Sequence, residues 1–425
     1  SRNRADWLLG VNSSYAICKA VGFGNNSLGR VQTPVLAEIC RRYRERENHM
    51  PADSWPVFIS LCKNDRILKM RHVDDLVVRR EALALYEDCK AAKSARITAV
   101  GKRTEEIGAP ALYNLAELQK DVNRYHGLTA IQVQEIAQSL YEKRLISYPR
   151  TSSRLLPKDV YDTLPPVMEK MLSRKEFRQY AGMVDLAAPQ DSIGAQDTME
   201  HHAIIITGIQ PGKLGREEML VYTLIVGRVL ETFMPPCKVE YTTVDAVCAA
   251  RKFRIRTYRI LEKGWLGIFE REHLVAKGRM PYQVMPDLFQ EEMLPVAGCS
   301  LIHKKSLPVS PYTDEELVNY MDKAGLGTVS TRTNILRTLL ERKYIRYSGK
   351  YVVPTPKGLF LYETVRGMKV ADASLTSGWE TELARIERGE LSQGKFLDGV
   401  LETVNEVTGE IFRNHPVEKR PQGTT

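Results

Sequence analysis

The chain reads Leu145-Ile146-Ser147-Tyr148-Pro149-Arg150-Thr151-Ser152-Ser153-Arg154 across the stretch that decides its fold. Pro149 stops the chain from continuing as a helix after the short apolar run. In an extended segment residues two apart lie on the same face, so we expect Tyr148 and Arg150 to share one surface. Tyrosine can be a nucleophile, and arginine binds phosphate with a fork of donors. The stretch indicates attack on a phosphodiester, and the alternative is that Tyr148 only packs.

The size and charge of the chain set broad limits on its class. Its 425 residues predict roughly two to four domains. The net charge of +9 fits a polyanionic partner such as nucleic acid, or simply a basic surface. The seven cysteines are scattered without a CxxC pair, which argues against a disulfide framework and a zinc ribbon and favours a reducing cytoplasm. No apolar run of about 18 residues and no signal peptide occur, so we expect no membrane partner.

A glycine-rich loop joins two predicted helices near the start. Residues 2–21 have helical spacing of their apolar side chains, and a loop follows at residues 22–29. A second helix opens after Arg30-Val31-Gln32-Thr33-Pro34. Such a loop can present backbone N–H groups to a phosphate, with Arg30 and Gln32 as side-chain partners. The sequence GxxxxGK[ST] occurs nowhere, so no ATP site is predicted.

Strand patterns appear in two separate parts of the chain. Residues 55–61 and 66–70 alternate like strands around a turn at Asn64-Asp65, and a helix is expected at about 80–92. The strand pattern returns at residues 239–248, 251–261 and 301–307. We therefore expect one β-rich domain whose chain is interrupted by a large, mostly helical insertion.

The insertion, at about residues 108–240, contains the tyrosine stretch. Its best-marked helix starts at Thr129, where Gln132 completes a capping box. Gln138 and Glu142 are four residues apart and share a helix face, from which a carboxylate could assist proton transfer. A solvated helix face is the alternative. Further on, His201-His202 precedes an apolar run, but no cysteine or acidic cluster accompanies the pair, so no metal site is predicted.

The last third of the chain has the outline of a winged helix-turn-helix. A capping box at Thr313-Asp314-Glu315-Glu316 opens one helix, and Ser330 or Thr331 is expected to cap a second. A hairpin at residues 344–353 would be the wing, which is a reason of its own to expect nucleic acid. Helices at about 357–368 and 379–412 and a polar tail at 413–425 complete the chain.

Taken jointly, these motifs resemble those of a type IA DNA topoisomerase, and the topoisomerase III branch most closely. Residues 146–151 look like the family's active-site tyrosine motif, and residues 29–34 resemble its GRVQTP element. His201-x-Ala203-Ile204 resembles HxAIxPT, and residues 325–332 with 342–345 resemble GxGTPATRA…RGYI. The four matches follow the family's order. Three residues depart from the pattern: Ile206 and Val329 stand where the family usually has proline, and Ser152 replaces an acidic residue.

The resemblance implies a role for each matched residue. Tyr148 would attack the DNA backbone and hold the 5′ phosphate, while Arg150 would stabilise the charge that develops on it. His201 would contact the same phosphate, and Gln138 and Glu142 would line the site. Because the ester conserves the free energy of the broken bond, religation would need no ATP. The single strand would be bound by Arg2, Asp6, Ser27, Arg30, Gln32, Thr151, His202, Ser330, Thr331 and Arg342.

The resemblance also implies a Toprim domain, whose DxDxE cluster binds magnesium, ahead of the matched region. No DxDxE and no zinc ribbon occur in this sequence. We therefore expect a fragment that begins where the Toprim domain ends, with the Mg²⁺ site of the full-length enzyme outside it and no zinc. Such a chain alone would bind single-stranded DNA without completing relaxation.

The fold that the resemblance implies is a mixed α+β, multidomain toroid. Residues 1–52 and 311–412 would form a helical domain with the winged-helix-like part, and residues 53–107 and 241–310 a β-rich arch. Residues 108–240 would carry Tyr148 at the tip of the arch. The expected partners are single-stranded and negatively supercoiled DNA, bound by a monomer in the cytoplasm at the nucleoid.

Two other classes of protein share some of these features. A winged-helix nucleic-acid-binding module would use the last third of the chain and leave Tyr148 as a packing residue. A tyrosine recombinase-type enzyme also directs Tyr, Arg and His at a phosphate, but usually places its tyrosine after the other two. Here Tyr148 precedes His201, which favours the topoisomerase interpretation.

Overall fold

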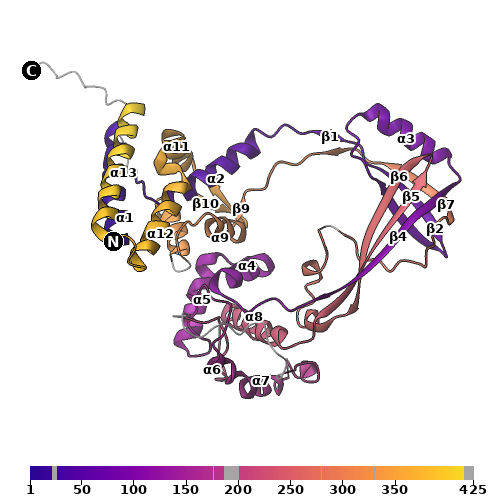
Figure 1. Cartoon of the computed structure of the whole chain (residues 1–425), viewed down its shortest axis with the longest axis horizontal. Helices are drawn as coiled ribbons and strands as arrows, with labels where there is room; N and C mark the ends of the chain where they lie inside the picture. The colour runs from indigo at the N-terminus through magenta and orange to yellow at the C-terminus, as the bar shows by residue number, and fades with distance from the viewer. Residues whose placement is uncertain (22–25, 176, 186–200, 279, 329–330, 416–425) are drawn as a thin grey trace, which may run out of the picture.

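The polypeptide follows a ring-shaped path. The computed structural model describes residues 1–21, 26–175, 177–185, 201–278, 280–328 and 331–415. Figure 1 shows one helical body on the left, a β-barrel on the right and a second helical body below. The chain leaves the first body, enters the barrel, passes through the lower body, and returns through the barrel to the first body. The interrupted strand pattern is thereby explained, and the predicted mixed α+β multidomain ring is confirmed.

The first body joins the two ends of the chain. Its largest contact is between α1 and α13, which lie side by side through buried residues such as Leu9, Ile17 and Val407. The predicted final helix is two helices, because the chain turns at Gly389, whose φ is +75°. The helices of this body are α1 (Arg2–Val21), α2 (Gln32–Glu47), α9 (Asp314–Lys323), α10 (Arg332–Glu341), α11 (Pro356–Val365), α12 (Ala373–Glu387) and α13 (Gln393–Asn414).

The winged part contains two helices and a small sheet. Thr313 and Glu316 form the predicted capping box of α9. Thr331 is the N-cap residue of α10, as predicted, but its hydroxyl bonds to Thr328 and accepts from no N–H of the helix. Ser330 lies outside the described residues. The predicted hairpin is confirmed as β10 (Ile345–Ser348) and β11 (Tyr351–Pro354), and β9 (Tyr312–Thr313) pairs with β11.

The arch is a closed six-stranded barrel in the order β2-β3-β6-β5-β4-β7. The predicted turn at Asn64-Asp65 is confirmed, with φ angles of 48° and 59° that suit a tight two-residue hairpin. The strand expected at 301–307 is found in part, as β8 (Lys304–Lys305), which pairs with β1 (Asp53–Ser54) outside the barrel. The barrel is closed by residues 293–301, which pair with β2 and β4. The strands are β2 (Val57–Lys63), β3 (Arg66–His72), β4 (Ser94–Ile107), β5 (Cys237–Cys248), β6 (Arg251–Glu262) and β7 (Met293–Leu301), with α3 (Arg79–Ala91) packed against β2 and β7.

The lower body is the helical insertion. Thr129 accepts from the backbone N–H of Gln132 while Gln132 accepts from that of Thr129, so the predicted capping box is confirmed. Val133, Ala137 and Leu140 follow on the buried face of the same helix. The helices are α4 (Leu115–His126), α5 (Ala130–Glu142), α6 (Lys158–Tyr161), α7 (Leu164–Leu172) and α8 (Arg216–Thr232). In the described part of the chain, no helix is long and apolar enough to cross a bilayer.

A polar seam joins the two helical bodies where α4 and α5 meet α9 and α10. Asp314, at the start of α9, accepts a 2.6 Å hydrogen bond from the backbone N–H of Ala130, at the start of α5. Further contacts across the seam join Gln119 to Thr333, Arg124 to Glu315 and Glu135 to Arg337. Ala116 and Ala130 add buried apolar contacts beside these polar ones. The junction thus combines polar and apolar contacts, as interfaces between domains do.

A buried charged cluster connects the lower body to the foot of the arch. Arg228 of α8 bonds to Asp121 of α4 at 2.8 Å and pairs with Glu231 at 3.0 Å. Arg271, beyond β6, reaches the same Asp121 at 2.9 Å. Burial raises the pKa of Glu231 to about 7 despite the neighbouring arginines.

The stability of the first body should depend on the close approach of α11 to Tyr344. A Cβ atom on Gly358 would lie 2.0 Å from the carbonyl oxygen of Tyr344, whereas one on Gly399 in α13 would meet no atom within 4 Å. We expect Gly358→Ala to lower the free energy of unfolding by about 1–3 kcal/mol through overpacking. Gly399→Ala should raise it by about 0.5–1 kcal/mol, and urea unfolding of both variants measures the contrast.

The charged cluster should make stability depend on pH. A free glutamate has a pKa of about 4.3, so the folded state holds the Glu231 proton to higher pH than the unfolded state. The free energy of unfolding that the protonated Glu231 contributes is fully present below the pKa of this group in the unfolded state. It is lost as pH rises through the pKa of the folded state, about 7. We expect Glu231→Gln to flatten the fall in melting temperature between acid and alkaline pH, relative to the exposed control Glu262→Gln. Equal pH slopes in the two variants would refute the effect.

Candidate active site around Tyr148

Tyr148 lies on a bent loop directly after α5. The helix ends at Lys143, and Arg144 takes a left-handed conformation with φ of 58°. Leu145 and Ile146 are then buried and anchor the loop in the lower body. The chain bends at residues 147 and 149, so the extended alternation expected for Tyr148 and Arg150 is wrong. The tyrosine ring is left partly exposed.

A second segment, residues 203–207, is hydrogen-bonded along this loop. The backbone N–H of Ser147 donates to the carbonyl of Ile205 at 2.9 Å, and that of Thr207 donates to Leu145 at 3.1 Å. The Ser147 hydroxyl donates to the carbonyl of Ala203 at 3.0 Å and accepts from the N–H of Ile205 at 2.9 Å. These bonds hold the histidine element against the tyrosine loop.

The same pairing brings His201 to the tyrosine. The Thr151 hydroxyl donates to the carbonyl of His201 at 3.1 Å, and the carbonyl of Thr151 accepts from the start of α4. The imidazole of His201 lies 4.5 Å from the Tyr148 ring, centroid to centroid. Tyr141 of α5 contacts the same ring edge-on at 5.4 Å. Spacing alone did not single out Tyr141, although it lies on the helix that carries Gln138 and Glu142.

Two polar atoms of this region have no protein partner among the described residues. They are Nε of Arg150 and Oε1 of Gln138, and both are buried. The amide nitrogen of Gln138 donates to Glu142 at 2.9 Å, so these two predicted residues do contact each other. A buried donor without a partner costs about 1–3 kcal/mol, and a bound anion would satisfy Arg150.

Arg30 forms an ion cluster in the first body. Its guanidinium is 4% exposed, donates to Asp6 at 2.6 Å and to Glu380 at 2.8 Å, and lies over the ring of Trp379. Arg2 pairs with the same Glu380. Three residues predicted to hold DNA thus hold α1 against α12. Sequence spacing could not identify Glu380, because it lies 350 residues from Arg30.

A second polar group forms where the loop before α2 meets the end of α10. Arg342 donates to the side chain of Gln32, and the backbone N–H of Ser27 donates to the hydroxyl of Tyr344 at 2.8 Å. His202 remains near the tyrosine loop, with Nδ1 at 2.7 Å from the carbonyl of Ala203. Most of the described strand-binding predictions are therefore divided between the tyrosine loop, the Arg30 cluster and this group, while Thr331 lies at the start of α10.

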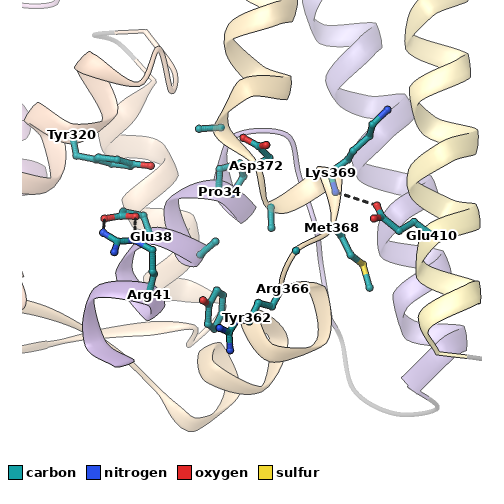
Figure 2. A pocket seen from close by; sticks show the side chains of 14 residues that line it. Pro34, Glu38, Arg41, Tyr320, Tyr362, Arg366, Met368, Lys369, Asp372 and Glu410 are labelled. Carbon is teal, nitrogen blue, oxygen red and sulfur yellow. Dashed lines mark hydrogen bonds and ion pairs between the residues drawn. The ribbon is translucent and has the colours of Figure 1, made fainter. Parts of the chain in front are cut away.

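A pocket of about 470 Å³ lies in the first body, between α2, α9 and α11 (Figure 2). Arg41 is bound by Glu38 at its rim, and the backbone N–H of Lys369 donates to Glu410. None of its lining residues is a predicted site residue. The pocket is thus separate from the tyrosine loop.

The chain matches a known family over nearly its whole length. The family model described as DNA topoisomerase matches residues 1–398. In fold, the chain is similar to full-length topoisomerase I from Thermotoga maritima, with a TM-score of 0.74 at 19% identity over 97% of this chain and 67% of that one. The chain therefore belongs to the type IA DNA topoisomerase family.

Curated relatives carry two different names. The chain is 29% identical to DNA topoisomerase 1 of Methanocaldococcus jannaschii, over 94% of this chain and 52% of the relative. It is 28% identical to DNA topoisomerase 3 of Bacillus licheniformis, over 97% of this chain and 60% of the relative. The chain thus spans between half and three fifths of these relatives, and the two identities do not separate the branches.

The Ser147 hydroxyl should be needed to hold the two segments together. Replacing it by alanine leaves the backbone N–H of Ile205 without a bond and removes the hydroxyl donor from the carbonyl of Ala203, which then has only Nδ1 of His202 beside it. The loss should cost about 1–3 kcal/mol of unfolding free energy. The exposed neighbour Ser152 serves as the control, and its alanine variant should change stability by less than about 0.5 kcal/mol. Chemical denaturation measures both, and an unchanged Ser147→Ala variant would contradict the assignment.

Proposed function

We propose that this chain cleaves and rejoins one DNA strand through a covalent bond to Tyr148. The observation that carries the proposal is the contact of a partly exposed Tyr148 ring with His201, on a loop where Nε of Arg150 has no partner in the described part of the chain. A phosphate placed there would meet the nucleophile and a cationic donor together. Membership of the topoisomerase family supports the same reaction.

The proposed step is an exchange of two ester bonds. The phenol oxygen of Tyr148 bonds to phosphorus, and the bond from phosphorus to the 3′ oxygen breaks. The phenol loses its proton, and the departing 3′ oxygen gains one. Arg150 stabilises the charge on the phosphate, and His201, which lies against the Tyr148 ring, contacts the same phosphate. Gln138 and Glu142 line the site, and Glu142 is the carboxylate of this pair that could take part in proton transfer.

The rejoining step is the reverse exchange. Because the tyrosine ester conserves the free energy of the broken bond, we propose that no ATP is used. The resemblance implies that a residue of the Toprim domain donates the proton to the departing 3′ oxygen. We therefore propose no residue of this chain as that proton donor. Among the described residues, no group of three or more His, Cys, Asp and Glu side chains could hold a metal ion. The residues present do not fit the implied magnesium, and no step is routed through it.

The strand itself would be bound by residues of both helical bodies. Ser27, Gln32 and Arg342 form one polar group in the first body, and Ser330 and Thr331 are further residues that we propose contact the strand. Thr151 and His202 would contact the strand beside the tyrosine. In this proposal Arg2, Asp6 and Arg30 act chiefly by fixing α1 against α12, because their charges are already paired.

Strand passage would require the ring to open. The polar seam between the helical bodies is the proposed opening, and the arch would act as the hinge. We propose single-stranded DNA, including exposed strands of negatively supercoiled DNA, as the substrate of a monomer that acts in the cytoplasm at the nucleoid.

Replacing Tyr148 by phenylalanine separates catalysis from binding. The variant keeps the ring and its contacts with His201 and Tyr141 but lacks the nucleophile, so it should form no covalent DNA adduct. Its affinity for single-stranded DNA should stay within about twofold of the unmodified chain, because one exposed hydroxyl adds little to binding. Denaturing gels with a labelled oligonucleotide and a Toprim domain supplied in trans detect the adduct, and fluorescence anisotropy measures the affinity.

Tyr282→Phe is the matched control, since Tyr282 is an exposed tyrosine of the arch. It should form the adduct as the unmodified chain does. Adduct formation by Tyr148→Phe would refute the proposal. A large loss of affinity in that variant would contradict the role assigned to Tyr148, because it would indicate that the hydroxyl serves binding.

A further inference from the structure

The end of α5 presents an exposed aromatic ring beside the tyrosine loop. Tyr141 is 39% exposed, although it directly follows the buried Leu140. Within the part of the chain that the structure describes, its hydroxyl has no hydrogen-bond partner. A single exposed aromatic side chain is ordinary in itself, but this one lies against Tyr148, with 5.4 Å between the ring centroids and 77° between the ring planes.

The helix end that carries Tyr141 is held independently of the tyrosine loop. Ser139 donates to the carboxylate of Glu218 in α8 at 2.7 Å, and Lys143 donates to the same oxygen. These bonds, that of Lys143 foremost, lower the pKa of Glu218 to about 2. Because α8 fixes this end of α5 from the side of the lower body, Tyr141 stands on a backbone that the loop does not have to order.

Two rings from two different elements therefore contact the ring of Tyr148. His201 lies 4.5 Å from it, centroid to centroid, with 48° between the planes, and Tyr141 completes the pair. A partly exposed tyrosine on a loop can ordinarily occupy more than one staggered rotamer. Tilted and edge-on contacts between aromatic rings are favourable, so each contact restricts the rotation of the Tyr148 side chain.

The orientation of this ring decides where the phenol oxygen points. Attack on phosphorus requires the two reacting atoms to approach within about 3–3.5 Å in an aligned geometry. The bonds of Ser147 and Thr151 fix the backbone of the loop, but they do not fix the side-chain rotation of Tyr148. That remaining freedom is what the neighbouring rings can remove.

We propose that Tyr141 is a positioning residue that holds the Tyr148 ring in the orientation for attack. The inference rests on the proposed function in taking Tyr148 as the nucleophile. Tyr141 acts through its ring and forms no bond with the DNA. Its hydroxyl is not required, because it has no partner among the described residues.

The test compares three variants of the full chain. Tyr141→Ala removes the ring, and Tyr141→Phe keeps the ring without the hydroxyl. Tyr282→Ala is the matched control, since Tyr282 is an exposed tyrosine of the arch whose ring lies edge-on to Tyr258 at 5.6 Å and 81°. The rate of adduct formation is measured in a single turnover, with the labelled oligonucleotide and the Toprim domain both saturating. Fluorescence anisotropy measures affinity for the oligonucleotide, and circular dichroism melting checks that each variant folds.

Tyr141→Ala should form the adduct about 10- to 100-fold more slowly than the unmodified chain, as a displaced reacting group does. Its affinity for the oligonucleotide should stay within about twofold, because no base stacks on the ring in this proposal. Tyr141→Phe should restore the rate to within about threefold, because it keeps the ring contact. Tyr282→Ala should change neither the rate nor the affinity.

Four results would overturn the inference. An unchanged rate in Tyr141→Ala would show that the ring does not position the nucleophile. A Tyr141→Phe chain as slow as Tyr141→Ala would assign the effect to the hydroxyl. A loss of affinity of about fivefold or more in Tyr141→Ala would make the ring a stacking surface for a base. Equal slowing by Tyr282→Ala would indicate a general effect of removing an exposed aromatic ring.

Failure of the proposed function would be recognised separately. Adduct formation by Tyr148→Phe would refute the proposed nucleophile, and this inference would fall with it. If Tyr148→Phe forms no adduct while Tyr141→Ala forms it at the normal rate, the proposed function stands and only the role of Tyr141 is refuted.

Discussion

The hydrogen bonds between the tyrosine loop and residues 203–207 are the interaction on which the site depends. A loop after a helix would ordinarily be free to move, and a nucleophile on it would be poorly oriented. Here Ser147 is bonded through both its backbone and its hydroxyl, and Thr151 fixes the carbonyl of His201. The side chains between these anchors, Tyr148 and Arg150, are left to meet a ligand.

The rest of the ring holds this rigid site within a body that can open. The closed barrel has no free sheet edge and gives the arch a stable end. The lower body is attached to the arch through the buried cluster around Asp121, and to the first body through the polar seam. The Tyr148 loop belongs to the lower body, so its position relative to the first body is set by this seam.

Local structure could be predicted where a short pattern determines it. The capping boxes at Thr129 and Thr313 and the turn at Asn64-Asp65 depend on residues within four positions of one another. The strand at 293–301 could not be predicted in the same way, because it is defined by pairing with β2 and β4. The loop geometry between Tyr148 and Arg150 was missed for a related reason, since its bends follow from the bonds to residues 203–207.

In the candidate site, too, contacts between residues far apart in the sequence could not be predicted from local patterns. The meeting of Tyr148 with His201 was implied by the family resemblance and not by spacing. The pairing of Arg30 with Glu380 was not foreseen, because no local pattern relates residues so far apart. Arg30 is held by Asp6 and Glu380, whereas Nε of Arg150 has no partner among the residues that the structure describes.

The measurement that tests the account most directly is the identity of the bond formed with DNA. A single strand labelled at either end would be trapped with the chain and a Toprim domain, and the linked peptide mapped by mass spectrometry. The account predicts a peptide containing Tyr148, esterified to the 5′ phosphate of the cleaved strand. A bond to a 3′ phosphate, or to any other residue, would contradict it.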